Sequence, residues 1–253
     1  MRKSPLYKAF GLLQPDYLQE ITERPFRVAV IGRSGVGKTT TLNSVFGLNR
    51  YTSRIAEGTT DVEEEIFDVR DGFKLSIFDM PGLGNDIDKD VQYEKLYEKI
   101  LPGCDVIVYI INGRSREVGE DCDILKNVVI RICQKNNILR NLVLAVNKID
   151  SIGETVDKND PDLRWNKVEN RPTEKLAKAI EDRLTNINRA LVKEKIFGEN
   201  GISIDNLVYY SAVYNFNLRE FFLAILKTER GWIWASTVGF ENIGKWSDKR
   251  MNL

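Results

Sequence analysis

The stretch Val28-Ala29-Val30-Ile31-Gly32-Arg33-Ser34-Gly35-Val36-Gly37-Lys38-Thr39-Thr40 decides the fold of this chain. An apolar run breaks into the pattern Gly-x-x-x-x-Gly-Lys-Thr, and residues 40–46, which suit a helix, follow at once. A strand end, a glycine turn and a helix N-terminus together direct backbone N–H groups at one point, where phosphate fits. Lys38 would then contact the β- and γ-phosphates, and the Thr39 hydroxyl would hold Mg²⁺. The alternative is a glycine-rich turn without a ligand. The expected phosphate-binding residues are Gly32, Ser34, Gly35, Val36, Gly37, Lys38, Thr39 and Thr40.

Three later segments indicate which nucleotide the chain binds. Residues 73–78 end at Asp79-Met80-Pro81-Gly82, where Asp79 can hold the Mg²⁺ shell and Gly82 lets a backbone N–H approach the γ-phosphate. Residues 141–146 end at Asn147-Lys148-Ile149-Asp150, and the Asp150 carboxylate matches the paired N–H donors of guanine. Residues 207–210 end at Ser211-Ala212, a small pair suited to close contact with a base. Because ligands bind at the carboxyl ends of strands in open α/β sheets, the set predicts a guanine nucleotide site.

The same segments carry a resemblance to a known family. Residues 32–39, 59–60, 79–82, 147–150 and 211–212 resemble the five sequence motifs of translation-factor-class GTPases, and within that class the Era-like group. Residues 97–112 also resemble small stand-alone Era-like GTPases of prophage-type loci. The resemblance covers about residues 25–228. It implies a P-loop NTPase G domain with Mg²⁺ as cofactor, Thr60 as a further Mg²⁺ ligand, and Lys38, Thr60 and Gly82 as the catalytic residues.

The rest of the chain predicts alternating strands and helices. Strands are expected at residues 26–31, 62–70, 73–78, 105–111, 141–146 and 207–210, and helices at 93–101, 119–135, from Pro172 onward, and at 217–228. The hairpin signal Asp71-Gly72 supplies one antiparallel strand in an otherwise parallel six-stranded α/β sheet with helices on both faces. We expect an N-terminal helical extension over residues 1–24, the G domain over 25–228, and an aromatic tail over 229–253 packed on or near it. The polar insertion at 151–171 is either a long loop or, beside Asp150, a specificity surface.

Composition excludes several kinds of site. Lys+Arg and Asp+Glu both number 37, so a broad nucleic-acid-binding surface is not expected. There is no histidine, which excludes a His-based hydrolase or a His-bound zinc, whereas GTP hydrolysis depends on positioning and electrostatics. The three cysteines have no paired spacing and indicate reduced thiols. With no apolar segment long enough to cross a membrane and no hydrophobic leader, we expect a cytoplasmic protein.

Leu83 departs from the pattern of many GTPases, which carry a glutamine after the glycine to orient the attacking water. Leucine has no hydrogen-bonding atom. We therefore expect slow basal hydrolysis of GTP to GDP and phosphate, stimulated by a protein partner or by self-dimerisation. Gly35 stands where some Era-like members hold potassium with an asparagine, which disfavours a potassium-stimulated mechanism. Two alternatives stay open: a GTP-dependent binding module with little or no hydrolysis, and a P-loop ATPase or kinase.

Overall fold

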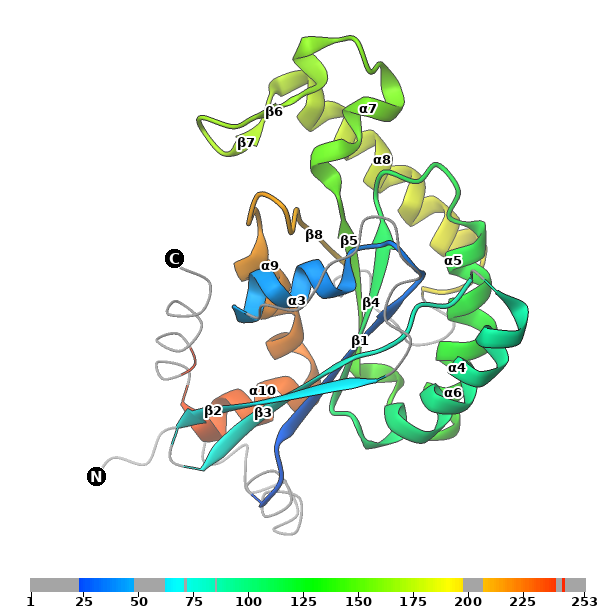
Figure 1. The fold of residues 1–253 in the computed structure, drawn as a ribbon, viewed down its shortest axis with the longest axis vertical. Helices are drawn as coiled ribbons and strands as arrows, with labels where there is room; N and C mark the ends of the chain where they lie inside the picture. The colour runs from blue at the N-terminus through cyan, green and yellow to red at the C-terminus, as the bar shows by residue number, and fades with distance from the viewer. Residues whose placement is uncertain are drawn as a thin grey trace.

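The structure, a computed structural model, describes residues 23–47, 62–70, 72–84, 86–197, 207–239 and 243. Its centre is a six-stranded sheet with the strand order β2-β3-β1-β4-β5-β8 (Figure 1). β2 pairs antiparallel with β3, and the other neighbours run parallel. The predicted mostly parallel α/β sheet with one antiparallel strand is therefore confirmed. The strands are β1 (Phe26–Gly32), β2 (Glu63–Arg70), β3 (Phe73–Asp79), β4 (Val106–Asn112), β5 (Leu142–Asn147) and β8 (Leu207–Tyr209).

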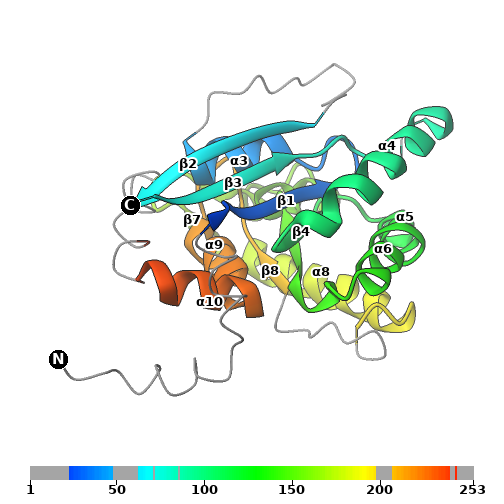
Figure 2. The same ribbon diagram turned by 90° about the horizontal axis from the view of Figure 1, so that it is seen from below.

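Helices cover both faces of the sheet (Figures 1 and 2). One face carries α3 (Lys38–Phe46), α9 (Leu218–Lys227) and α10 (Glu229–Val238). The opposite face carries α4 (Ile87–Ile100), α5 (Gly119–Ile124), α6 (Arg131–Lys135) and α8 (Glu174–Lys193). Successive side chains of a strand point to opposite faces, so Val28 and Val30 enter one core while Ala29 and Ile31 enter the other. The central strands are almost wholly apolar because both of their faces are covered.

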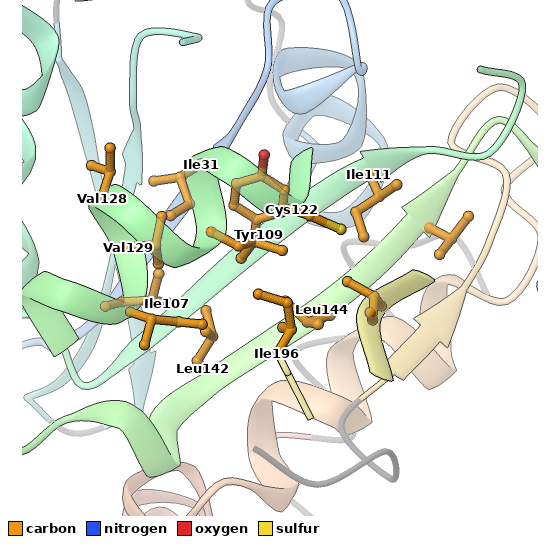
Figure 3. Packing of buried hydrophobic residues seen from close by; sticks show 14 of the residues in the cluster. Ile31, Ile107, Tyr109, Ile111, Cys122, Val128, Val129, Leu142, Leu144 and Ile196 are labelled. Atoms are coloured by element: carbon orange, nitrogen blue, oxygen red, sulfur yellow. The ribbon is translucent and has the colours of Figure 1, made fainter. Parts of the chain in front are cut away.

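The core on the α5 side contains a buried hydrogen-bonded pair of polar groups. Ile107, Tyr109 and Ile111 of β4 lie beside Leu142 and Leu144 of β5, under the helix that carries Cys122, Val128 and Val129 (Figure 3). The Tyr109 side chain is fully buried, and its hydroxyl donates to Asp121 Oδ1 at 2.9 Å. Burial raises the pKa of the Tyr109 hydroxyl well above its ordinary value. A buried carboxylate therefore lies at the end of a largely apolar core.

Residues 119–135 differ from the single α-helix that the sequence predicts. A π-helical segment, Leu125–Ile130, joins α5 to α6 without a break in the helical path. Leu125, Val128, Val129 and Ile130 are all buried. A π-turn is wider than an α-turn, so it presents these neighbouring side chains to the same core. Apolar spacing alone does not distinguish the two kinds of turn.

The insertion at residues 151–171 is folded rather than an open polar loop. It contains the short helices α7 (Gly153–Val156) and η5 (Pro161–Leu163) and the two-stranded sheet of β6 (Trp165–Asn166) and β7 (Arg171–Pro172). A Cβ at Gly153 would collide with the Leu163 carbonyl oxygen, so the insertion folds tightly back on itself. The expectation that Pro172 opens the next helix is wrong: Pro172 ends β7, and Thr173 caps α8 by accepting from Leu176 N–H.

The last described helix, α10, packs against the sheet domain. The Trp234 ring stacks on Phe26 with centroids 4.8 Å apart, and Trp234 is buried. Arg230 and Arg24 both donate to the buried Asp105 carboxylate, at 2.9 and 2.7 Å. Most of the predicted N-terminal extension, the loop with Thr59 and Thr60, and nearly all of the tail beyond residue 239 lie outside the described residues. Within the described ranges, no helix is both long and apolar enough to cross a bilayer.

Candidate nucleotide-binding site

The phosphate-binding loop lies between the end of β1 and the start of α3, as the sequence predicts. Gly35 and Gly37 adopt left-handed backbone conformations, with φ of 73° and 98°. A Cβ at Gly37 would lie 2.5 Å from Asn147 Nδ2, so only glycine fits there. Helix α3 begins at Lys38 directly after this turn. The first N–H groups of a helix have no partner within it, so they are directed at the loop's interior, where an anion is favoured.

Lys38 lies across the loop with its side chain almost wholly buried. Its Nζ donates to Gly32 O at 3.2 Å and to Arg33 O at 3.1 Å. Burial lowers the pKa of the Lys38 ammonium to about 8, although the charge of Asp79 acts in the opposite direction. A phosphate group in the loop would give this ammonium an anionic partner. The geometry thus holds a cation ready at the base of the loop.

Thr39 and Asp79 bring two oxygen ligands together. Thr39 Oγ1 donates to Asp79 Oδ2 at 2.8 Å, and Asp79 is fully buried at the end of β3. Adjacent oxygens around an octahedral Mg²⁺ at 2.0–2.1 Å are about 2.9 Å apart. The described residues contain no cluster of three or more His, Cys, Asp or Glu side chains. Mg²⁺ is usually held by one or two protein ligands, with water and substrate phosphates at its other positions, so the Thr39 and Asp79 oxygens suit this ion.

Residues 79–84 are fixed against the phosphate-binding loop by backbone contacts. Ser34 N–H donates to Leu83 O at 3.3 Å, and the buried Tyr97 hydroxyl donates to Pro81 O at 2.7 Å. A Cβ at Gly82 would lie 2.6 Å from Ser34 N and 2.8 Å from Lys38 Nζ, so the backbone passes directly beside the lysine. The Leu83 side chain is 2% exposed and faces the core. No side chain of residue 82 or 83 therefore reaches the phosphate position.

Asn147 and Lys148 contact the phosphate-binding loop, and Asn147 also contacts the loop after β8. Asn147 Nδ2 donates to Val36 O at 3.0 Å, while its Oδ1 accepts from Ala212 N–H at 3.1 Å. Lys148 adopts a positive φ of 63°, and its Nζ donates to Gly35 O at 2.5 Å. Burial, followed by the charge of Arg114, lowers the pKa of Lys148. One buried amide thus joins the loop after β1 to the loop after β8.

Asp150 is held by two serine hydroxyls. Ser211 Oγ donates to Asp150 Oδ1 at 2.5 Å, and Ser151 Oγ donates to Asp150 Oδ2 at 2.9 Å. Ser211 is fully buried, whereas Asp150 is only partly covered. A carboxylate fixed in this way has the orientation needed to accept a pair of N–H donors.

The structure brings most of the predicted site residues to one edge of the sheet. Thr40 lies in the first turn of α3, beside Lys38 and Thr39. Thr60 lies outside the described residues. Further contacts that the sequence analysis missed come from Ser44, whose hydroxyl donates to Ala212 O, and from Tyr210 and Thr41, whose hydroxyls lie 2.8 Å apart. Thr41 and Ser44 lie among other polar residues of α3, and Tyr210 follows the apolar strand β8, so no spacing pattern marks these three residues.

Comparison with known proteins agrees with this geometry. Residues 27–148 match the family model described as "50S ribosome-binding GTPase". GTPase Der of Vibrio parahaemolyticus is 30% identical over 145 residues, which is 56% of this chain and 28% of Der. Residues 27–148 therefore resemble the P-loop GTPase domains of the Era/Der class. The Escherichia coli protein YfjP, described as uncharacterized, is 27% identical over 126 residues, which is 49% of this chain and 43% of YfjP. The chain therefore spans less than half the length of these two relatives.

Solved structures show the same fold. Era from Aquifex aeolicus superposes with a TM-score of 0.56 at 21% identity, covering 81% of this chain and 57% of that one. Toc33 from Arabidopsis thaliana superposes with a TM-score of 0.54 at 19% identity, covering 97% of this chain and 91% of Toc33. Both support the predicted fold class of a G domain.

Proposed function

We propose that the chain binds GTP and GDP at this site and hydrolyses GTP to GDP and phosphate as a molecular switch. The observation that carries this proposal is the pairing of Asn147 and Asp150. Asn147 bonds the phosphate-binding loop through Val36 and the Ser211-Ala212 loop through Ala212, and Asp150 is oriented by the Ser211 hydroxyl. These hydrogen bonds hold the phosphate-binding loop and the Asp150 carboxylate at a fixed separation. The carboxylate can accept hydrogen bonds from the N–H donors of guanine.

In the proposed mechanism the residues act by positioning. Lys38 would exchange its carbonyl contacts for the β- and γ-phosphate oxygens, and Gly82 N–H would contact the γ-phosphate. Thr39 and Asp79, together with Thr60, would hold Mg²⁺. When bound, the ion would neutralise part of the negative charge of the phosphates. Departure of the γ-phosphate would release residues 79–84 and the loop that contains Thr60.

The buried Leu83 supports a slow basal rate. GTP hydrolysis needs a group near the γ-phosphate that orients the attacking water, but the Leu83 side chain faces the core. We therefore propose that a protein partner or a second copy of the chain stimulates hydrolysis. The same observation favours the alternative of a GTP-dependent binding module with little or no hydrolysis. Single-turnover hydrolysis measured with and without cell extract separates the two, since only a stimulated GTPase gains rate from the extract.

Several finer expectations remain proposals. These are the division into residues 1–24, 25–228 and 229–253, a cytoplasmic location, and the likeness to prophage-type members.

Base preference tests the proposal directly. Asp150→Asn removes the carboxylate and is expected to move the preference from GDP toward XDP, because an amide can pair with the xanthine ring. Asp182→Asn, on the exposed side of α8, is the matched control and should leave the preference unchanged. Competition binding with GDP, XDP and ADP measures the result. An Asp150→Asn variant that keeps its guanine preference would favour the P-loop ATPase or kinase alternative.

A further inference from the structure

The insertion contacts the loop that orients Asp150. We call residues 210–217, between β8 and α9, the base loop. In Figure 1 the β6–β7 hairpin lies beside this loop, and the contacts below join the two. The Trp165 ring stacks on Tyr214 with centroids 5.1 Å apart and planes 21° apart, and it meets Phe216 edge-on at 5.1 Å. Trp165 is 7% exposed, although it belongs to an insertion rich in charged residues.

A polar contact accompanies the aromatic cluster. Asn170 Nδ2 donates to the backbone oxygen of Tyr214 at 2.9 Å, and Asn170 Oδ1 accepts from Trp165 Nε1 at 3.3 Å. One side chain thus ties the hairpin to the base loop and fixes the indole at the same time. Asn170 has a positive φ of 49°, a conformation in which asparagine is favoured.

Within the base loop, the same residues lead to Asp150. Ser211 and Phe216 exchange two backbone hydrogen bonds of 3.0 Å, and Tyr214 N–H donates to Ser211 Oγ at 3.2 Å. Ser211 Oγ in turn donates to Asp150 Oδ1. The path from Trp165 to the carboxylate is therefore continuous, and each step is a contact in the structure.

We propose that Trp165 and Asn170 of the insertion are positioning residues that hold the base loop against Asp150 and so set the affinity and lifetime of the bound guanine nucleotide. This inference rests on the proposed function of the site. The aromatic cluster stabilises one conformation of the base loop, the loop holds the Ser211 hydroxyl on Asp150, and the hydroxyl fixes the carboxylate for the base. Without the cluster, the loop samples other conformations and the carboxylate loses its orientation.

The position of the contacts predicts which nucleotide groups are affected. The insertion touches the base end of the site, whereas the phosphates are bound by the loop after β1. The effect should therefore depend on the base. GDP offers both an N1–H and a 2-amino group to a carboxylate, IDP offers only the N1–H, and inorganic tripolyphosphate offers neither.

The test uses the whole chain with Trp165→Ala, Trp165→Phe and Asn170→Gly. Trp165→Phe keeps a ring in the cluster, and Asn170→Gly removes the side chain where glycine tolerates the positive φ. Asn159→Gly, an exposed position of the same insertion, is the matched control. Dissociation of fluorescently labelled GDP is measured for each variant, with competition by GDP, IDP and tripolyphosphate. Thermal melting shows whether each variant is folded.

We expect Trp165→Ala to weaken GDP binding by about tenfold, since an aromatic pair of this geometry is worth up to about one decade in an equilibrium constant. The preference for GDP over IDP should shrink, tripolyphosphate binding should stay unchanged, and Trp165→Phe should recover most of the loss. Asn170→Gly should follow the same pattern with a smaller change, and it decides the matter if Trp165→Ala does not fold.

Two results overturn the inference alone: a folded variant with unchanged GDP and IDP affinities, or equal losses for GDP, IDP and tripolyphosphate, which would show general damage. If the unaltered chain itself binds no guanine nucleotide, or does not prefer GDP to IDP, the proposed base recognition fails first and the inference fails with it.

Discussion

Replacing Asp121 by asparagine is expected to change how stability depends on pH. Asp121 is 1% exposed, and its Oδ1 accepts from the Tyr109 hydroxyl at 2.9 Å. Its Oδ2 has no hydrogen-bond partner among the described residues. Burial raises the pKa of Asp121 from 3.8 to about 6, although the Tyr109 hydrogen bond and the charges of Arg33 and Arg183 act in the opposite direction. The charged carboxylate is therefore the unfavourable form in the folded chain.

The sign and size of the effect follow from linkage. The folded state holds this proton more tightly than the unfolded state, so the contribution to stability is fully present below pH 3.8 and is lost as pH rises through about 6. A shift of about two units corresponds to about 3 kcal/mol, of which roughly 1.4 kcal/mol is lost between pH 5 and pH 7.5. Asparagine at this position is neutral at every pH, so the variant lacks this loss.

Urea unfolding at pH 5.0, 6.0, 6.8 and 7.5 measures the difference between the two proteins. An unpaired N–H of the asparagine amide costs the same free energy at every pH, so this cost cancels in the comparison. The free energy of unfolding of Asp121→Asn should gain about 1.4 kcal/mol on the original chain between pH 5.0 and 7.5. Parallel curves over this range would refute the reasoning.

Asp105→Asn gives the contrasting case. Asp105 is equally buried but contacts Arg24 and Arg230, and it accepts from Arg27 N–H at 2.9 Å. The amide removes the charge that these arginines pair with, so the variant should be destabilised at pH 7.5, by about 2 kcal/mol because both arginines are partly exposed. Asp121 and Asp105 therefore differ in what surrounds them rather than in depth.

Three further predictions concern the nucleotide site. Gly82→Ala would place a Cβ 2.6 Å from Ser34 N, so we expect its affinity for a non-hydrolysable GTP analogue to fall more than its affinity for GDP, as measured by calorimetry. Leu83→Gln would bury an amide in the core and should lower the free energy of unfolding by about 1–3 kcal/mol without a faster single-turnover rate. Burial lowers the pKa of Lys38 to about 8, and a bound phosphate favours the ammonium form, so GDP affinity should fall above pH 8 and binding there should take up a proton. Calorimetry in buffers of different ionisation enthalpy measures this proton uptake. Lys38→Met should abolish the uptake.

The sheet and the convergence of the site could be predicted because both depend on local patterns. β4 and β5 are nearly continuous apolar runs, β1 and β3 are mostly apolar, and the phosphate-binding, Asp79 and Asn147 motifs each lie at the end of one of these strands. Since the carboxyl ends of parallel strands meet at one edge, Lys38, Asp79 and Asp150 had to approach one another once the strands were placed. The observed strand ends differ from the prediction by one residue at most positions, for example Asn147 now closes β5.

The parts that could not be predicted depend on contacts between distant residues. The β6–β7 hairpin has two residues in each strand, too few for a sequence period. Trp165 packs against Tyr214 and Phe216, which belong to another segment of the chain. The contrast between Asp121 and Asp105 is of the same kind, since Asp105 directly precedes an apolar strand and Asp121 lies in the acidic first turn of α5, and only the folded chain shows their partners.

The contacts of residues 79–84 give the proposed slow rate and the proposed stimulation one physical cause. Ser34 N–H bonds the Leu83 carbonyl, Gly82 leaves no room for a side chain beside Lys38, and Gly84 N–H donates to the Asp90 carboxylate at 3.0 Å. A backbone fixed on both sides of residue 83 turns that side chain into the core, so changing its chemistry alone does not bring a polar group to the γ-phosphate. The water-orienting group of the proposed reaction must therefore come from another element of the chain or from a second molecule. This is why we expect the rate to respond to a partner more strongly than to substitution at residue 83.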